Sequence, residues 1–459
     1  MLIGIKLRAN PTPHQRLILS QWMGCARCIW NAKVEEEHYY RTFARKYCPI
    51  GTYAPIDQTT AQFKSSELTP WLSDCPSQIL RNSAVNWFKT YKKFMNGQCG
   101  RPKRKPKTDK SSIHLTREVF RFDRCEDGNL RLFIGTKTNN IGYLSFKAHG
   151  QFQLPNSMTI RKERGQYTLS FCYENTVSDT DLLTPEQHLT RLQGATRDYL
   201  EVNTIGIDRG VVIPVHAGDQ TYDFTQDQKK SMSKSERYIK RLQRRLARQQ
   251  KGSHRRAKTK HRIAVHHAKK ANIRHDFAHK TSRSLVNSDA NVIVFEALRT
   301  SAMTRKPKAQ QDEKGRYVSN RAKQKAGLNQ SILNVGWHLI EAYTTYKAFH
   351  AGKAVFKIPA PRTSQECALC GHTHPDNRRS QDLFACGHCG HTDNADHNAS
   401  LVIKKRAIHL ILDTGTVLSD DGVLRPKSDT GRGGMRKTSR TISSTSSGLR
   451  SVKKEKLAA

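Results

Sequence analysis

Apolar and polar positions along the first 200 residues predict a helical part followed by a β part. A strand-like start, IGIKL, leads into TPHQ at residues 12–15, where Thr12 can cap a helix and Gln15 can complete a capping box. Apolar and aromatic residues then recur at helical spacing as far as Phe94. From 113 to 174 short β runs alternate with turn residues, which predicts a small antiparallel barrel or sheet. Residues 175–200 are expected to form a polar connection.

Three apolar segments farther along the chain each carry an acidic residue. Asp208 interrupts one strand-like run, Glu296 ends another, and Asp396 stands at the expected start of a helix. A carboxylate in a buried strand is costly unless it is paired or binds a cation. Three such acids could converge on two Mg²⁺ ions, which prefer carboxylate oxygens and promote phosphodiester hydrolysis. Each acid alone has an equally good interpretation as a cap, turn or salt-bridge residue.

Two CxxC pairs stand between the second and the third of these acids. Their cysteines are Cys367, Cys370, Cys386 and Cys389, with fifteen residues between the pairs. Four thiolates at this spacing are typical of a tetrahedral structural zinc site, and a glycine follows each pair where a tight knuckle needs one. Cys25 and Cys28 form another CxxC, but no partner pair is near, so we expect buried thiols there.

Charge and cysteine usage narrow the class of protein. The 459 residues include 79 Lys plus Arg against 39 Asp plus Glu, a net charge of +40, which indicates a polyanionic partner. A mean hydropathy of −0.71 without a long apolar run argues against a transmembrane helix. Eleven cysteines and no export signal make a disulfide framework improbable. We expect a cytoplasmic, nucleoid-associated protein of a bacterium or archaeon.

Basic residues are densest between residues 234 and 274, which hold sixteen Lys or Arg and one acid. Like charges on a solvated helix repel, and a bound nucleic-acid backbone would remove that penalty. A second basic run lies in the Gly- and Pro-rich segment 96–112, a phosphate-facing loop or a mobile linker. The predicted nucleic-acid contacts are Arg101, Lys103, Arg104, Lys105, Arg237, Lys240, Arg241, Arg244, Arg245, Arg248, Arg255 and Arg256.

The order of these segments resembles one family. The DRG strand, the FEAL strand, LNQSILNVGW, the two cysteine pairs and NADHNASLVI look like the RuvC-like half of TnpB proteins. These are insertion-sequence-encoded, RNA-guided nucleases similar to the compact type V CRISPR effectors. The PTPHQ, GCARCIWN and GRPKRKPK segments resemble the same family. The similarity touches most of residues 1–405 and is dense from about 204 to 403.

The resemblance implies an α+β multidomain protein. An RNase H-like (RuvC) nuclease domain would hold Mg²⁺ through Asp208, Glu296 and Asp396, with an inserted zinc-ribbon-like knuckle. A small wedge-like β-barrel and a helical recognition lobe would precede it. The expected bounds are 1–10 and 113–200 for the barrel, 11–112 for the lobe, 201–366 and 390–412 for the nuclease, 367–389 for the target-nucleic-acid-binding knuckle, and 413–459 for a disordered basic tail.

The resemblance also implies the function, an RNA-guided DNA endonuclease whose partners are a guide RNA and target double-stranded DNA next to a short flanking motif. Arg209 and Ser400 depart from the family pattern without removing a metal ligand. Glu296 follows Asp208 by only 88 positions, which leaves too little chain for an added HNH nuclease domain. A guided DNA-binding repressor that does not cut, a small type V CRISPR effector and a DNA-joining transposase are the alternatives. The sequence leaves the oligomeric state open.

Overall fold

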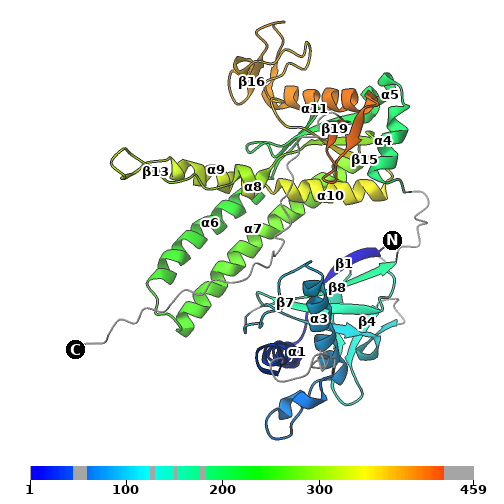
Figure 1. Cartoon of the computed structure of the whole chain (residues 1–459), viewed down its shortest axis with the longest axis vertical. Coiled ribbons are helices and arrows are strands. Elements are labelled where there is room, and N and C mark those ends of the chain that lie inside the picture. Colours follow the sequence, from blue (N-terminus) through cyan, green and yellow to red (C-terminus); the bar gives the residue numbers. More distant parts are fainter. Residues whose placement is uncertain are drawn as a thin grey trace, which may run out of the picture. The chain divides into compact units, whose positions relative to one another are not determined.

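The chain folds into two compact units. The computed structural model describes residues 2–44, 59–108, 110–124, 130–148, 152–174 and 182–427. The first unit comprises Met1–Asp181 with Lys230–Ala271, and the second comprises Leu182–Lys229 with Asn272–Ala459. Both units contain helices (Figure 1), and each has its own apolar cores. The predicted α+β multidomain class is therefore confirmed, whereas the finer domain bounds stay predictions.

Two long helices form the helical part of the first unit. α1 (Pro13–Tyr39) begins at the predicted capping box, in which the Gln15 N–H donates to Thr12 Oγ1 at 3.3 Å and the Thr12 N–H donates to Gln15 Oε1 at 3.0 Å. Its buried face packs with α3 (Ser77–Met95). Short helical turns complete this part: η1 (Tyr40–Ala44), η2 (Ala61–Phe63), η3 (Pro70–Leu72) and η4 (Arg117–Val119).

The β part of the first unit consists of two antiparallel sheets that share a core with the helices. One sheet has the order β2-β7-β8-β1-β6 and the other β3-β4-β5. The predicted β runs lie in these strands, so that prediction is confirmed. The strands are β1 (Leu2–Ala9), β2 (Ser111–Thr116), β3 (Phe120–Arg124), β4 (Leu130–Gly135), β5 (Asn140–Leu144), β6 (Phe146–Lys147), β7 (Ser157–Glu163) and β8 (Gln166–Glu174).

A five-stranded mixed sheet forms the centre of the second unit. Its order is β11-β10-β9-β12-β15, with β9, β12 and β15 parallel and β10 antiparallel to both of its neighbours. Every residue of β12 is buried, as expected for a central strand covered on both faces. The strands are β9 (Thr204–Asp208), β10 (Val215–Ala217), β11 (Gln220–Tyr222), β12 (Val292–Glu296) and β15 (Ala354–Ile358).

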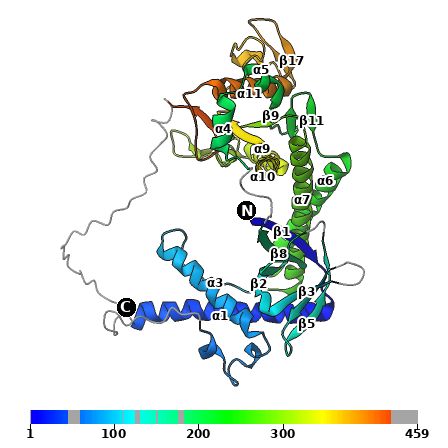
Figure 2. The same ribbon diagram turned by 90° about the vertical axis from the view of Figure 1, so that its right-hand side faces the viewer.

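Helices cover both faces of this sheet, as Figures 1 and 2 show. One core joins the sheet to α7 (His254–Val286), α9 (Ala322–Val335) and α10 (Trp337–His350), and another joins it to α4 (Pro185–Gln193) and α11 (Ala395–Leu412). The remaining elements are α5 (Arg197–Asn203), α8 (Thr300–Met303), η6 (Pro375–Asn377), β13 (Gln310–Gln311), β14 (Tyr317–Val318), β16 (Leu383–Ala385), β17 (Thr392–Asn394), β18 (Thr416–Leu418) and β19 (Leu424–Pro426).

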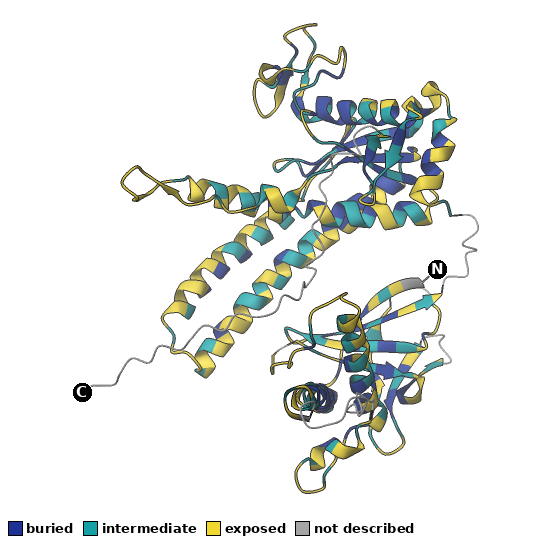
Figure 3. Cartoon of the chain, viewed as in Figure 1, coloured by how far each residue is buried: buried dark blue, intermediate teal, exposed yellow. Residues whose placement is uncertain are grey.

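The basic stretch forms an antiparallel pair of helices, α6 (Gln226–Ala247) and the first part of α7. One face of α6 is apolar, and its Ile239 and Leu242 are buried. Most of the remaining surface of this pair is exposed (Figure 3). No helix in the described residues is both long and apolar enough to cross a bilayer.

Two expectations need correction. The polar connection at 175–200 instead contains α4 and α5, because Thr184 and Gln187 form a capping box and Leu189 and Leu192 bury an apolar face. The tail predicted as disordered from residue 413 instead begins with the hairpin β18–β19, whose Leu424 is fully buried. Residues 428–459 lie outside the described part.

Candidate active site and metal centre

Strand register brings the first two acids together. β9 and β12 are parallel neighbours, with Ile207 opposite Phe295, and Asp208 and Glu296 are the next residues on each strand. Both carboxylates therefore stand at the same edge of the sheet. Glu296 is buried at 6% exposure, and Asp208 is partly buried.

The third acid reaches this edge on helix α11. Asn394 caps the helix by accepting from the Asp396 and His397 N–H groups at 3.0 and 3.2 Å. The helix lies unusually close to β9, because a Cβ placed on Gly206 would come within 2.1 Å of the Ser400 carbonyl oxygen. Asp396 Oδ2 lies 3.6 Å from the corresponding Cβ position of Gly210, two residues after Asp208. A glycine at 206 thus permits the approach that brings the third acid to the other two.

The electrostatics of the three acids show the same convergence. Burial raises the pKa of Asp208 to about 7, and the charges of Glu296 and Asp396 add to that increase. Burial also raises the pKa of Glu296, against a lowering by the Thr363 hydroxyl, which donates to Glu296 Oε1. Mutual repulsion of carboxylates in a partly dry site is what a bound cation relieves.

The three carboxylates are spread more widely than the ligands of a single ion. In the described part of the chain, the only set of three or more candidate ligands within 4.8 Å of one another is the four cysteines. Arg378 donates to Asp396 Oδ1 at 3.2 Å.

Arg209, the departure from the family pattern, is part of a buried ion network behind the acids. Its side chain is 2% exposed and donates to Glu341 Oε2 at 2.6 Å and to the backbone oxygen of Glu296. Lys357 Nζ lies 3.3 Å from the other oxygen of Glu341. Arg209 thus holds the end of β12 in place, and its charge lowers the pKa of Glu296.

The four predicted cysteines converge on one point. Cys367 Sγ lies 3.7 Å from Cys389 Sγ, and Cys370 Sγ lies 3.7 Å from Cys386 Sγ. Tetrahedral zinc with Zn–S bonds of about 2.3 Å needs sulfurs about 3.8 Å apart, whereas a disulfide needs about 2.05 Å. The backbone N–H groups of Cys389 and His388 lower the pKa of Cys386 to about 6, which favours a thiolate. The donor set and spacing fit zinc.

Each cysteine pair forms the tight turn that the sequence predicted. Gly371 and Gly390 have φ of 76° and 72°, in the left-handed region that favours glycine. Their N–H groups donate to the carbonyls of Cys367 and Cys386 at 2.9 and 3.2 Å. The turn geometry thus places both cysteines of a pair on the same side.

Sequence reasoning missed several residues that hold these sites together. Buried Asn377 links the two knuckles, since its amide donates to the His372 carbonyl at 3.1 Å and accepts from the Gly387 N–H at 3.0 Å. Buried Asn398 on α11 accepts from the Ala368 N–H at 2.9 Å, which ties the first knuckle to the helix of Asp396. The available signal was the polar Asn398 on the face of α11 that also carries Ala395, Ala399 and Val402.

The predicted nucleic-acid residues fall into two groups. On α6 the predicted basic residues are exposed, as is Arg255, whereas Arg256 is half-buried and donates to the Gln249 carbonyl at 2.8 Å across the turn to α7. Near residue 100, Arg104 and Arg101 lie 3.2 and 3.9 Å from acids of α1. The Lys105 amine lies 3.3 Å from the centroid of Trp30, and burial lowers its pKa to about 8. Lys103 is exposed.

Three family descriptions match this chain. They are "Helix-turn-helix domain" at residues 1–42, "Probable transposase" of the OrfB_IS605 type at 170–306, and "Cas12f1-like, TNB domain" at 337–403. The last range contains the four cysteines and Asp396. Residues 2–42 form β1, α1 and the start of η1 here.

Similar proteins extend over nearly the whole chain. An Escherichia coli K12 protein named "Putative RNA-guided DNA endonuclease InsQ" is 28% identical over 92% of this chain and 96% of its own length. A Streptomyces pristinaespiralis protein named "Putative RNA-guided DNA endonuclease" is 22% identical over 86% of this chain and 87% of its own length. The Cas12f1 protein in a complex with guide RNA and target DNA has the same fold, with a TM-score of 0.50 and 12% identity over 88% of this chain and 98% of that one.

The family descriptions and the fold make this chain similar to OrfB-type and Cas12f-like proteins. The predicted resemblance to the TnpB family is confirmed by these similarities.

Proposed function

We propose that this protein is an RNA-guided DNA endonuclease of TnpB type. One observation carries the proposal: three acids from separate segments meet at one edge of a sheet, with charges that raise the pKa of Asp208. Support comes from two relatives that are named RNA-guided DNA endonucleases and match along most of the chain. All three acids are present, which favours cutting over guided binding without cleavage.

The nuclease domain is of the RNase H-like, RuvC type. This proposal is supported by the strand order β11-β10-β9-β12-β15, in which only β10 runs in the opposite direction. It is also supported by the packing of α11 on β9. In this arrangement the acids at the ends of β9 and β12 face the start of α11. Such a fold would bring together Asp208, Glu296, which follows 88 positions later, and Asp396, which follows after another 100.

Asp208, Glu296 and Asp396 would hold the catalytic Mg²⁺. The metal supplies an activated water and stabilises the leaving oxygen of the phosphodiester. The chain's own groups orient the ligands, since Thr363 donates to Glu296 and Arg378 donates to Asp396. Zn²⁺ on the four cysteines would have a structural role, fixing the knuckle next to α11.

Guide RNA and target double-stranded DNA are the proposed partners. The exposed cations of α6 and of the start of α7 form a surface suited to a phosphate backbone, and the net charge of +40 supports it. Base pairing would read the sequence, whereas the protein holds the duplex by its backbone.

The function is tested by purifying the full-length protein, sequencing the RNA that co-purifies, and offering plasmid DNA that matches its variable end. We expect one structured RNA species and Mg²⁺-dependent cleavage of the matched plasmid alone. Binding without cleavage would favour the repressor, and joined DNA products would favour the transposase.

A further inference from the structure

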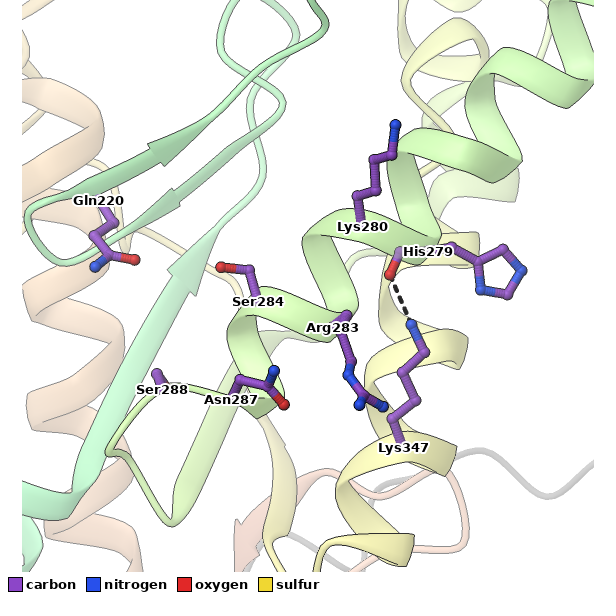
Figure 4. Close-up of a pocket in the computed structure, with 8 residues that line it drawn as sticks. All are labelled: Gln220, His279, Lys280, Arg283, Ser284, Asn287, Ser288 and Lys347. Atoms are coloured by element: carbon purple, nitrogen blue, oxygen red, sulfur yellow. Dashed lines mark hydrogen bonds between the residues drawn. The ribbon is translucent and has the colours of Figure 1, made fainter. Parts of the chain in front are cut away.

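A basic cavity of about 710 Å³ opens on the face of the second unit formed by α7 and α10. None of the acids or cysteines described above lines it, and no nucleic-acid residue predicted from the sequence does. Figure 4 shows its residues, which come from α7 and the turn after it, from α10, and from the start of β11. They are Gln220, His279, Lys280, Arg283, Ser284, Asn287, Ser288 and Lys347.

No acid lines this cavity, although three cations do. Arg283 is exposed, and its guanidinium has no ion pair or hydrogen bond within the described residues. Lys347 extends from α10 and donates to the His279 carbonyl at 2.7 Å (Figure 4). It also donates to Ser282 Oγ at 2.7 Å. Lys280 lies 2.9 Å from Asp276, which lies outside the lining. Arg283 is therefore the cation with the most unused donors.

Within the part of the chain that the structure describes, neither Arg283 nor Lys347 forms an ion pair with an acid. Burial lowers the pKa of Lys347, and the charge of Arg283 adds to that effect. Uncompensated like charges cost free energy, which a bound anion would recover. Ser284 and Asn287 add neutral donors beside Arg283, on the side that faces Gln220 (Figure 4).

The walls of the cavity are fixed in place. Tyr222 connects β11 to α7, because its hydroxyl donates to Gln220 Oε1 at 2.7 Å and lies 3.2 Å from Ser284 Oγ. Leu285 and Val286, on the inner side of α7, are buried in the core. Such a frame holds donors in position before a ligand arrives, which lowers the entropic cost of binding.

We propose that this cavity binds a phosphodiester group of a nucleic-acid backbone, with Arg283 as the main contact and Lys280 and Lys347 beside it. A planar guanidinium with free donors matches a phosphate. The lining offers no exposed aromatic face for a base apart from His279, which stacks on Tyr343, so backbone contact is favoured over base reading. The proposal rests on the proposed function in taking a nucleic acid as the ligand.

The test measures how binding depends on salt. Full-length protein, washed free of RNA, is titrated with labelled strands of about 20 nucleotides as single-stranded RNA, DNA duplex and RNA–DNA hybrid. Arg283→Ala should weaken binding of the polymer that occupies the cavity roughly three- to tenfold. It should also lower the slope of log K against log salt concentration by about 0.7–0.9. Arg283→Lys should largely restore the slope. Lys280→Ala should cause a smaller loss of the same kind.

The matched control is Arg197→Ala, an exposed arginine on α5 in the same unit. A lower slope for Arg283→Ala but not for the control supports the site, and the polymer that shows it is the occupant. An unchanged slope with all three polymers, or an equal loss in the control, overturns the proposal. Because binding needs no cleavage, failure of the nuclease function would show separately, as a wild-type protein that binds but never cuts.

Discussion

At the scale of single residues, the raised pKa of Asp208 sets a pH dependence. The pKa rises from 3.8 to about 7 in the folded chain, so between these values the folded state binds more protons than the unfolded state. The contribution of Asp208 to the free energy of unfolding of the metal-free protein should therefore fall as pH increases from about 4 to about 7, and this destabilisation is complete above that range.

Asp208→Asn removes the cost of ionising a buried carboxyl group at this position. In magnesium-free buffer we expect the variant to be more stable than the wild type by on the order of 2 kcal/mol at pH 8, with little difference at pH 4. Urea denaturation at several pH values measures the difference. A constant difference across the range would contradict the assigned burial, and added Mg²⁺ should narrow the gap at high pH.

Arg209 gives a second prediction for single residues. Glu341→Gln leaves the buried guanidinium with its main counterion gone, so the free energy of unfolding should fall by about 3 kcal/mol. Glu201→Gln, which breaks an exposed pair with Arg197, should change it by less than about 1 kcal/mol. If Glu341→Gln and Glu201→Gln lowered the free energy of unfolding equally in urea denaturation, Arg209 would not depend on a buried ion pair with Glu341.

At the scale of elements, the contact of α11 with β9 depends on Gly206. Gly206→Ala places a methyl group against the backbone of Ser400 and Lys404, so we expect a loss of stability of about 1–3 kcal/mol and weaker metal binding as Asp396 moves away. Gly24→Ala is the matched control, because its Cβ would meet nothing within 4 Å in helix α1. That control should be neutral or stabilising by up to about 1 kcal/mol.

The cysteine knuckle should be a separate element in unfolding. Cys370→Ser should abolish bound zinc, measured by metal analysis, and open the knuckle to protease while the sheet of the second unit keeps its stability. Cys172→Ser, at an exposed cysteine on β8, should keep the zinc content of the wild type. Full zinc in Cys370→Ser would contradict four-cysteine coordination.

Elements were predictable where the signal is local. The TPHQ sequence predicted the start of α1, and the same logic applied to TPEQ at 184–187 would have found α4, which a polar composition concealed. The three acids were also visible in the sequence, because Asp208 interrupts an apolar run, Glu296 ends one and Asp396 stands at the start of a helix. Thr363 and Arg378 were not, since their bonds to Glu296 and Asp396 arise only when distant segments meet.

At the scale of the whole molecule, two sites with different chemistry follow one another along the chain. The cysteine knuckle ends at Cys389, and the helix that carries Asp396 begins at Ala395. Asn398 joins them through the Ala368 N–H. Zinc chelation should therefore reduce both cleavage and the stability of the knuckle, whereas loss of an acid should reduce cleavage and leave the stability of the knuckle unchanged.

The most direct test of the account substitutes the acids one at a time in the full-length protein with its RNA. Asp208→Ala, Glu296→Ala and Asp396→Ala should each abolish Mg²⁺-dependent cutting of matched DNA while RNA-dependent binding of that DNA persists. Asp289→Ala, at an exposed acid in the turn before β12, should cut like the wild type. Cleavage at the wild-type rate by any of the three acid variants would contradict the proposed metal site.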